Sequence, residues 1–273
     1  MRGILFNAII SFVGYTLVFA LLTKVWPNDK KQPLFARQGL LTDVYYYFGT
    51  VFIYSLLAAL LIETSRRWLG KLTGQAPDNA VMFAWLATWP MWLQVGVMWL
   101  LSDFLQYWLH RWFHGPTMWR YHAIHHSATQ LDWLTSFRFH PVNYILYATS
   151  VTVLFSLIGF APAAAILKGP LDTAQSLLSH ANLNWTFGPL RWLVAIPVFH
   201  RWHHTKTDVA QNKNFAATFP FFDLLFGTYY MPEGVQPADY GVDEPVPEDL
   251  GGQLLYPFQA HEDSLPVTAQ LHS

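Results

Sequence analysis

Cysteine is absent from this chain of 273 residues, and charged side chains are scarce at 12%. The first absence excludes disulfides, cysteine-ligated zinc, iron–sulfur clusters and a thiol nucleophile. The second disfavours an ordinary soluble enzyme, because soluble domains carry about 25% charged residues. A net charge of −1 and a pI near 6.9 provide no basic surface, so we expect no nucleic-acid partner.

Apolar residues dominate instead and are arranged in long runs. Hydrophobic residues make up 53% of the chain and aromatic residues 17%. About 20 apolar residues are needed for a helix to cross a bilayer. The runs cover residues 5–22, 44–62, 81–101 with an aromatic extension to His110, and 143–178 with a break at 159–162. We therefore expect an all-α, polytopic membrane helical bundle of about four spans. Lys168 and Asp172 leave open whether the second half of the last run crosses fully.

The first run could also be a secretory signal peptide. It is long, has only Arg2 before it and lacks a small-x-small cleavage site, so we favour a membrane span. Four basic residues follow the first run and three follow the second. The positive-inside rule then slightly favours a cytosolic first loop, and three crossings place the residues after His110 on the same side.

The C-terminal segment differs in composition. No Lys or Arg follows Lys213, whereas eight acidic residues and several prolines lie between 229 and 273. This composition predicts an extended, solvated tail, in which His261 and His272 are isolated and without a role. We divide the chain into N-terminal spans and loops (1–80), a catalytic membrane domain (81–230) and an acidic, proline-rich tail (231–273).

Three histidine clusters carry the candidate chemistry. They read HxxxH from His110, HxxHH from His122 and HxxHH from His200. Positions i, i+3 and i+4 share one face of a helix, so each cluster directs its imidazoles to one point. Imidazole is the commonest protein ligand for iron, zinc and copper. Eight imidazoles exceed what one ion coordinates, so two metal ions are expected.

Metal-free packing, transport and zinc-protease chemistry fit the clusters less well than a di-metal site. Packing eight rings without a shared partner would cost kilocalories per ring. A proton relay or metal-transport path should lie within the membrane, whereas these clusters lie at the ends of the spans. A zinc-protease HExxH site is excluded because no cluster contains glutamate.

The ordered set of motifs resembles the fatty acid hydroxylase/sterol desaturase superfamily of membrane histidine-box oxygenases. The resemblance covers about residues 85–230. It includes the segments 103–111, 138–141, 180–182, 212–215 and 222–228 around the histidines. The departures are small: Phe222 stands where the family often has Trp, and Phe215-Ala216 where it has Tyr-Gly.

The resemblance implies a cytosolic histidine-rich metal-binding cap that holds two iron ions, with zinc as a substituted metal. It also implies O2-dependent hydroxylation or desaturation of a lipid, and ether cleavage by hydroxylation would use the same site. An alkyl C–H bond offers no charge to an acid or base, so O2 activated at a redox metal is the plausible oxidant. Because the chain has neither a GxGxxG fingerprint nor cysteine, we expect a separate cytochrome- or ferredoxin-type electron donor. The alternative is a non-redox membrane protein with a structural or transported metal.

The expected metal ligands are the eight box histidines and one histidine that the resemblance adds between the second and third boxes. They are His110, His114, His122, His125, His126, His180, His200, His203 and His204. His140 and Asn184 are two further candidates. Metal-bound imidazoles usually donate their other N–H to a carboxylate or carbonyl, so Asp103 and Asp223 are expected to support the ligands.

Overall fold

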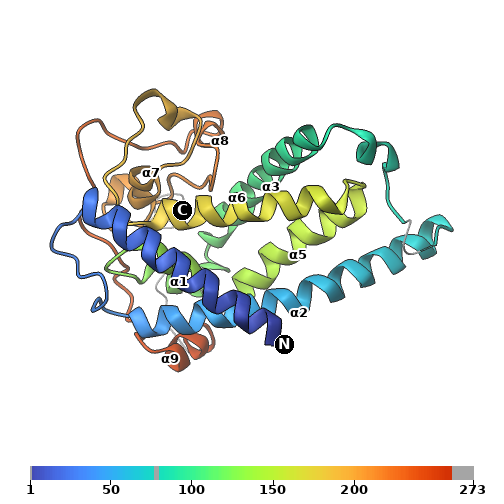
Figure 1. Ribbon diagram of the computed structural model, residues 1–273. Helices are drawn as coiled ribbons and strands as arrows, with labels where there is room; N and C mark the ends of the chain where they lie inside the picture. Colours follow the sequence, from blue (N-terminus) through green and yellow to red (C-terminus); the bar gives the residue numbers. More distant parts are fainter. Residues whose placement is uncertain (1, 77–79, 260–273) are drawn as a thin grey trace.

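The computed structural model describes residues 2–76 and 80–259. Within these residues all regular structure is helical, apart from two isolated β-bridges. The all-α class is therefore confirmed for the described chain. Figure 1 shows long helices that diverge from a compact region of short elements, which we call the cap (residues 114–140 and 181–259).

Five long helices contain the apolar runs. They are α1 (Arg2–Val25), α2 (Leu40–Thr73), α3 (Met91–Phe113), α5 (Pro141–Ile158) and α6 (Pro162–His180). Helix α5 packs against α2, α6 packs against α3, and α1 contacts α2 at an angle (Figure 1). The sequence predicted each of these helices.

Two helices, α1 and α5, are long and apolar enough to cross a membrane. Only 11% and 17% of the residues in their apolar windows are buried, whereas the core helix of a soluble protein is mostly buried. Large apolar side chains are exposed on the other long helices as well, among them Leu56, Trp92 and Ile166. Such extensive apolar exposure is typical of a lipid-facing surface.

The break between α5 and α6 is a tight turn at Gly159, as the sequence suggested. Its φ of +116° favours glycine. A Cβ at this position would lie 2.7 Å from the carbonyl oxygen of Phe83. The amide of Phe83 in turn donates to the carbonyl of Ile158, at 2.9 Å. The segment before α3 therefore packs directly on the turn.

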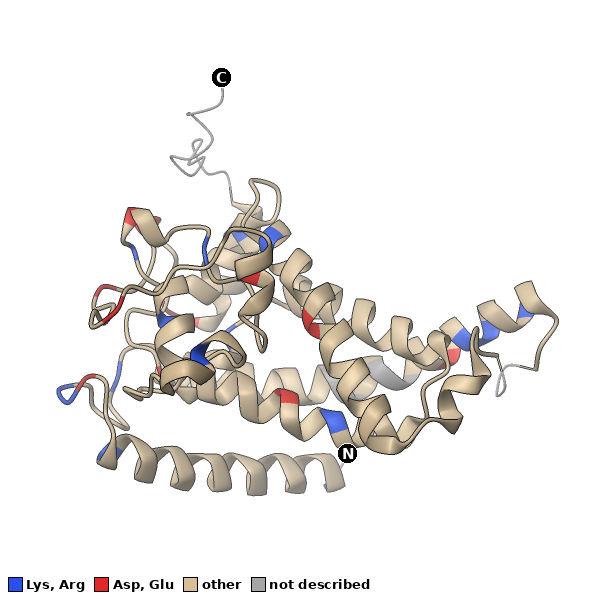
Figure 2. Cartoon of the chain, turned by 90° about the horizontal axis from the view of Figure 1, so that it is seen from above, with Lys and Arg blue, Asp and Glu red and all other residues tan. Residues whose placement is uncertain are grey.

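The cap is built from short helices and loops. Its helices are α4 (Trp119–His126), η3 (Trp133–Phe137), η4 (Gly188–Trp192), α7 (Pro197–His203), η5 (Asp208–Ala210), α8 (Phe221–Leu225), α9 (Leu250–Leu255) and η6 (Tyr256–Phe258). One further short helix, η2 (Ala84–Thr88), precedes α3 outside the cap. Figure 2 shows charged residues gathered on the cap and at the far end of α2, with few on the helices between. This distribution matches a helical bundle with two polar ends and an apolar middle.

The acidic C-terminal segment is less solvated than its composition predicts. Trp119 Nε1 donates to Glu244 at 2.9 Å, and the Thr42 hydroxyl donates to the carbonyl of Glu248 at 2.7 Å. Tyr256 is buried against α4 and the start of α2. These contacts attach the acidic stretch to α4 and to the start of α2. His261 and His272 lie outside the described residues.

Candidate metal centre

The nine predicted histidines lie together in two adjacent groups. One group contains His110, His114, His122, His126 and His203, and the other contains His125, His180, His200 and His204. Within each group, one ligand atom per residue lies within 4.8 Å of all the others. The groups touch, because the ring centroid of His126 in the first group lies 4.4 Å from that of His204 in the second.

Each histidine is presented by a helix end. The first box occupies the last turn of α3 and the residue after it, the second forms the end of α4, and the third ends α7. His180 is the last residue of α6. Every box contributes to the centre, but only the first box keeps its histidines in one group, as the helical spacing predicted. The second and third boxes divide between the groups, since His125 and His126, like His203 and His204, point to different groups.

Backbone carbonyls fix the orientation of four rings. His110, His125, His180 and His203 donate their Nδ1–H to the carbonyls of Phe215 (2.8 Å), Arg138 (3.1 Å), Ser176 (2.9 Å) and Lys213 (2.7 Å). A carbonyl can only accept, so the proton of each ring is on Nδ1 and the lone pair is on Nε2. In the first group, His114 Nδ1 contacts Asn212 Oδ1 at 3.3 Å.

The donor set fits bound cations. His125 Nε2 and His180 Nε2 face each other at 3.3 Å, although both carry a lone pair and no proton. The Nε2 atoms of His114, His126 and His203, and both ring nitrogens of His122, are buried without a partner. Buried polar atoms are normally paired, so two facing lone pairs and five orphaned nitrogens need a shared positive partner.

The electrostatic environment keeps these imidazoles neutral. Burial lowers the pKa of His122, His126, His203 and His204 well below its ordinary value, and neighbouring imidazoles lower it further. Burial likewise lowers the pKa of His125. Neutral imidazole is the form that binds metal, so at neutral pH no proton must leave these rings first.

The two predicted aspartates act on a loop and not on the rings. Asp103 accepts hydrogen bonds from the backbone N–H of Ala217, Thr218 and Phe219 at 2.7–3.1 Å. Asp223 accepts from the N–H of Phe215 and Ala216 and from the Thr228 hydroxyl, at 2.7–2.9 Å. The Phe215 carbonyl accepts a hydrogen bond from His110. Both carboxylates therefore support the centre through the backbone of this loop, one hydrogen bond further from the rings than expected.

The loop 212–216 reaches its shape through two asparagines in the left-handed region. Asn212 has φ 55° and Asn214 has φ 59°, conformations that asparagine adopts more readily than most residues. The Asn214 amide donates to the carbonyls of Phe199 and Tyr230 and accepts from the Tyr230 N–H, at 2.7–2.9 Å. These bonds place the Lys213 carbonyl beside His203.

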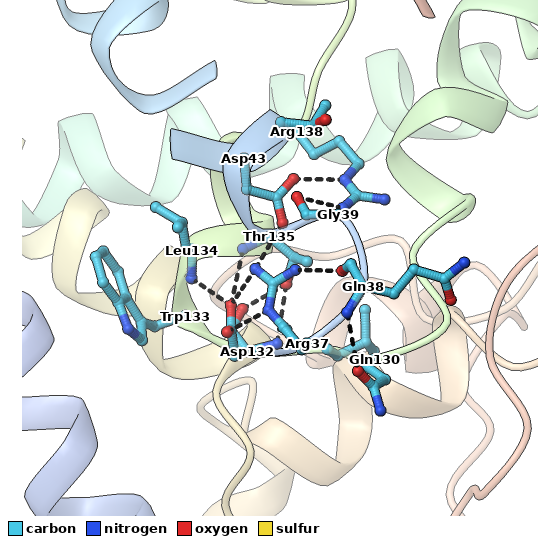
Figure 3. Close-up of polar contacts among 12 residues, drawn as sticks. Arg37, Gln38, Gly39, Asp43, Gln130, Asp132, Trp133, Leu134, Thr135 and Arg138 are labelled. Carbon is cyan, nitrogen blue, oxygen red and sulfur yellow. Dashed lines mark hydrogen bonds and ion pairs between the residues drawn. The ribbon is translucent and has the colours of Figure 1, made fainter. Parts of the chain in front are cut away.

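A buried ion-pair network supports the second histidine box, which contains His122, His125 and His126. Asp43 at the start of α2 bonds Arg37 at 2.6 Å and Arg138 at 2.5 Å, and Arg37 also pairs with Asp132 (Figure 3). Asp132 caps η3 through the N–H groups of Leu134 and Thr135. Since the Arg138 carbonyl accepts from His125, this network positions a histidine of the second group.

Neither this network nor Asn212 was predicted from the sequence to be functional. Arg138 and Asn212 do lie in segments that carry the family resemblance, which was a usable signal. No such signal in the sequence marked Asp43. A single carboxylate beside an apolar run shows no pattern until the fold brings Arg37 and Arg138 to it.

Two further ligand candidates lie outside both groups. His140 caps α5 by accepting from the Val142 N–H at 3.1 Å, and its other ring nitrogen donates to the Leu254 carbonyl at 3.3 Å. It therefore connects α5 to the C-terminal segment. Asn184 is exposed, and its backbone N–H donates to the Trp26 carbonyl at 3.2 Å.

A cavity of about 610 Å³ opens beneath the histidines. His110, His122, His125, His180 and His200 form one end of its wall. Residues of α1, α2, α3, α5 and α6 form the remainder. The cavity therefore connects both histidine groups with the space between the long apolar helices, and its volume falls within the range for a small-molecule site.

Comparison with known proteins agrees with this geometry. Residues 95–228 match the family described as Fatty acid hydroxylase. Ornithine lipid hydroxylase OlsE of Rhizobium tropici is 30% identical over 175 residues, which cover 64% of this chain and 53% of that protein. Alkylglycerol monooxygenase of Xenopus tropicalis is 28% identical over 165 residues (59% of this chain, 35% of that protein).

A sterol enzyme is also similar. Delta(7)-sterol 5(6)-desaturase ERG3A of Gibberella zeae is 23% identical over 235 residues, covering 85% of this chain and 61% of that protein. The chain thus spans about a third to three fifths of the length of these relatives. No solved structure matches it significantly. All the histidines of both groups lie between residues 95 and 228, the segment that matches the fatty acid hydroxylase family.

Proposed function

We propose that this protein is a membrane-bound non-haem di-iron oxidoreductase that uses O2 to hydroxylate or desaturate a lipid. The observation that carries the proposal is the pair of imidazole groups that line a cavity between apolar helices. The names of the relatives, a lipid hydroxylase, a monooxygenase and a sterol desaturase, support the same class of reaction.

The proposed metal ligands follow the two groups. His110, His114, His122, His126 and His203 would hold one ion, and His125, His180, His200 and His204 the other. When bound, two iron ions supply the redox chemistry that attack on an unactivated C–H bond requires. An all-imidazole set also suits zinc, which we propose only as a substituted metal.

The chain's own residues would orient the metal ligands and bind the lipid. The carbonyls of Phe215, Arg138, Ser176 and Lys213 hold four rings so that Nε2 faces the centre. Phe139 stacks on the His125 ring at 4.0 Å and lines the cavity, so it gives this imidazole an apolar neighbour on the substrate side. The cavity would hold the lipid chain with one carbon beside the histidines and would exclude bulk water there.

We further propose four crossings, formed by α1, α2, α3 and the α5–α6 hairpin, with the cap in the cytosol. The proposed domains remain 1–80, 81–230 and 231–273. A cytosolic cap would let a separate cytochrome- or ferredoxin-type protein deliver electrons, since the cysteine-free chain has no cluster to store them. The lipid would enter laterally from the bilayer.

Metal analysis combined with O2 uptake tests the proposal. Protein purified in nanodiscs should contain about two irons per chain. With a chemical reductant and a membrane lipid extract it should consume O2 and yield a product heavier by one oxygen or lighter by two hydrogens. Stoichiometric zinc with no lipid-dependent O2 uptake after iron loading would instead support the non-redox alternative.

A further inference from the structure

Asn143 is a buried amide without a partner in the cavity wall. The side chain is 1% exposed, and neither its oxygen nor its nitrogen has a hydrogen-bond partner. It nevertheless lines the same cavity as the histidines. Leaving a buried polar group unpaired is unfavourable, so a native amide in this state indicates a partner that arrives with a ligand.

Several buried polar residues of the same wall are satisfied by the protein. The Gln175 amide donates to the Ser179 hydroxyl and to the carbonyls of Ala195 and Ala217, at 2.6–3.2 Å. The Ser136 hydroxyl donates to the Trp133 carbonyl at 2.7 Å. Further along, the Tyr147 hydroxyl donates to Gln106 Oε1 at 2.8 Å. Asn143 is therefore distinct from the neighbouring structural polar groups.

The unpaired amide of Asn143 lies at the histidine end of the cavity. It is the third residue of α5, which begins at the cap and runs away from it (Figure 1). Phe139, four residues earlier, stacks on His125 and lines the same wall. A group bound to Asn143 would therefore lie near the carbon that is oxidised and not at the distant end of a chain.

We propose that Asn143 hydrogen-bonds a polar group of the substrate and selects lipids that carry a hydroxyl, ether, ester or amide close to the oxidised carbon. An amide side chain both donates and accepts, so it suits each of these groups. A plain hydrocarbon chain would leave the amide unpaired. This inference rests on the proposed lipid oxidation and narrows its substrate class from any lipid to an amphiphile bound by its polar end.

Equilibrium binding to metal-loaded protein in nanodiscs tests the role of Asn143 without turnover. The probes are 1-O-hexadecylglycerol and hexadecane, which share a chain length and differ in the polar group. Asn143→Leu keeps the number and branching of the side-chain heavy atoms and removes both hydrogen-bonding atoms. It should weaken hexadecylglycerol binding about tenfold, the equivalent of one hydrogen bond, and leave hexadecane binding unchanged. Asn143→Thr restores a hydroxyl and should recover part of the affinity.

Thermal unfolding of the lipid-free variant provides a second readout. Asn143→Leu removes an unpaired buried amide, so the midpoint should rise by about 2–4 °C. A fall in the midpoint together with unchanged hexadecylglycerol affinity would show a purely structural role and overturn the inference. Failure of the proposed function is separate, because it would appear in the wild type as missing iron or missing O2 uptake.

Discussion

At the scale of single residues, the chain orients its imidazoles with backbone carbonyls more than with side-chain carboxylates. Asp103 and Asp223 each accept several N–H groups from one loop, and that loop provides the carbonyl for His110. A carboxylate that organises a loop can influence several ligands together. Losing it should therefore misplace ligands without removing any of them.

Replacement of a ligand and replacement of a supporting residue should have different consequences. His125→Ala should abolish lipid oxidation and lower bound iron, while the protein stays inserted, because insertion depends on apolar helices. Asp103→Asn keeps every ligand and should reduce turnover by about 10–100-fold, as is typical of changes beyond the ligands. Iron analysis and product yield per inserted protein measure both effects. Full oxidation with stoichiometric iron in His125→Ala would make the histidine boxes structural.

At the scale of helices, the buried ion-pair network joins α2 to the second histidine box. Asp43 is fully buried between Arg37 and Arg138, whereas Glu63, on the same helix, pairs with Arg67 at the surface. Breaking a buried pair leaves an uncompensated charge and costs about 3–5 kcal/mol. An exposed pair contributes about 0–1 kcal/mol. The two carboxylates on one helix therefore form a natural comparison.

Asp43→Asn should lower the thermal midpoint strongly and loosen metal binding, whereas Glu63→Gln should change neither. Both substitutions neutralise one carboxylate at nearly constant volume. Thermal unfolding in detergent and iron content after gel filtration measure the difference. Equal midpoints for the two variants would contradict a supporting role for the network.

The turn between α5 and α6 provides a second test at this scale. Gly159→Ala should destabilise the hairpin, because alanine is strained at φ +116° and its Cβ would press against the Phe83 carbonyl. The cost should be on the order of 1–3 kcal/mol. Gly96→Ala is the control, because its Cβ would meet no atom within 4 Å and alanine favours the middle of α3. The midpoint should fall for the first variant and hold or rise for the second.

At the scale of the whole molecule, the sequence predicted what depends on repeated local patterns. Long apolar runs became α1, α2, α3, α5 and α6, and helical spacing brought His110 and His114 of the first box into one group. The division of His125 and His126 between two groups was not predictable, because it depends on how α4, α6 and α7 meet. The attachment of the acidic segment by Trp119 and Tyr256 was missed because composition records charge and not the contacts of a few aromatic residues.

Orientation in the membrane is a property of the whole molecule. The first two loops differ by one basic residue, which favours one orientation only slightly. The cysteine-free chain allows a direct measurement, because any introduced cysteine is the single reactive thiol. Val209 lies on the cap with 61% of its surface exposed, and Lys71 is exposed at the far end of α2. Replacing each with cysteine places one thiol at each polar end of the bundle.

A membrane-impermeant maleimide should label Val209→Cys in inside-out vesicles and not in right-side-out vesicles, whereas Lys71→Cys should show the opposite pattern. The expectation follows because α2 runs from the cap to the opposite end (Figure 1), so its two ends should face different compartments if the bundle spans the membrane. Labelling of both thiols from one side would contradict a crossing by α2. The reverse pattern would keep the bundle but place the cap, and the electron donor it requires, outside the cytosol.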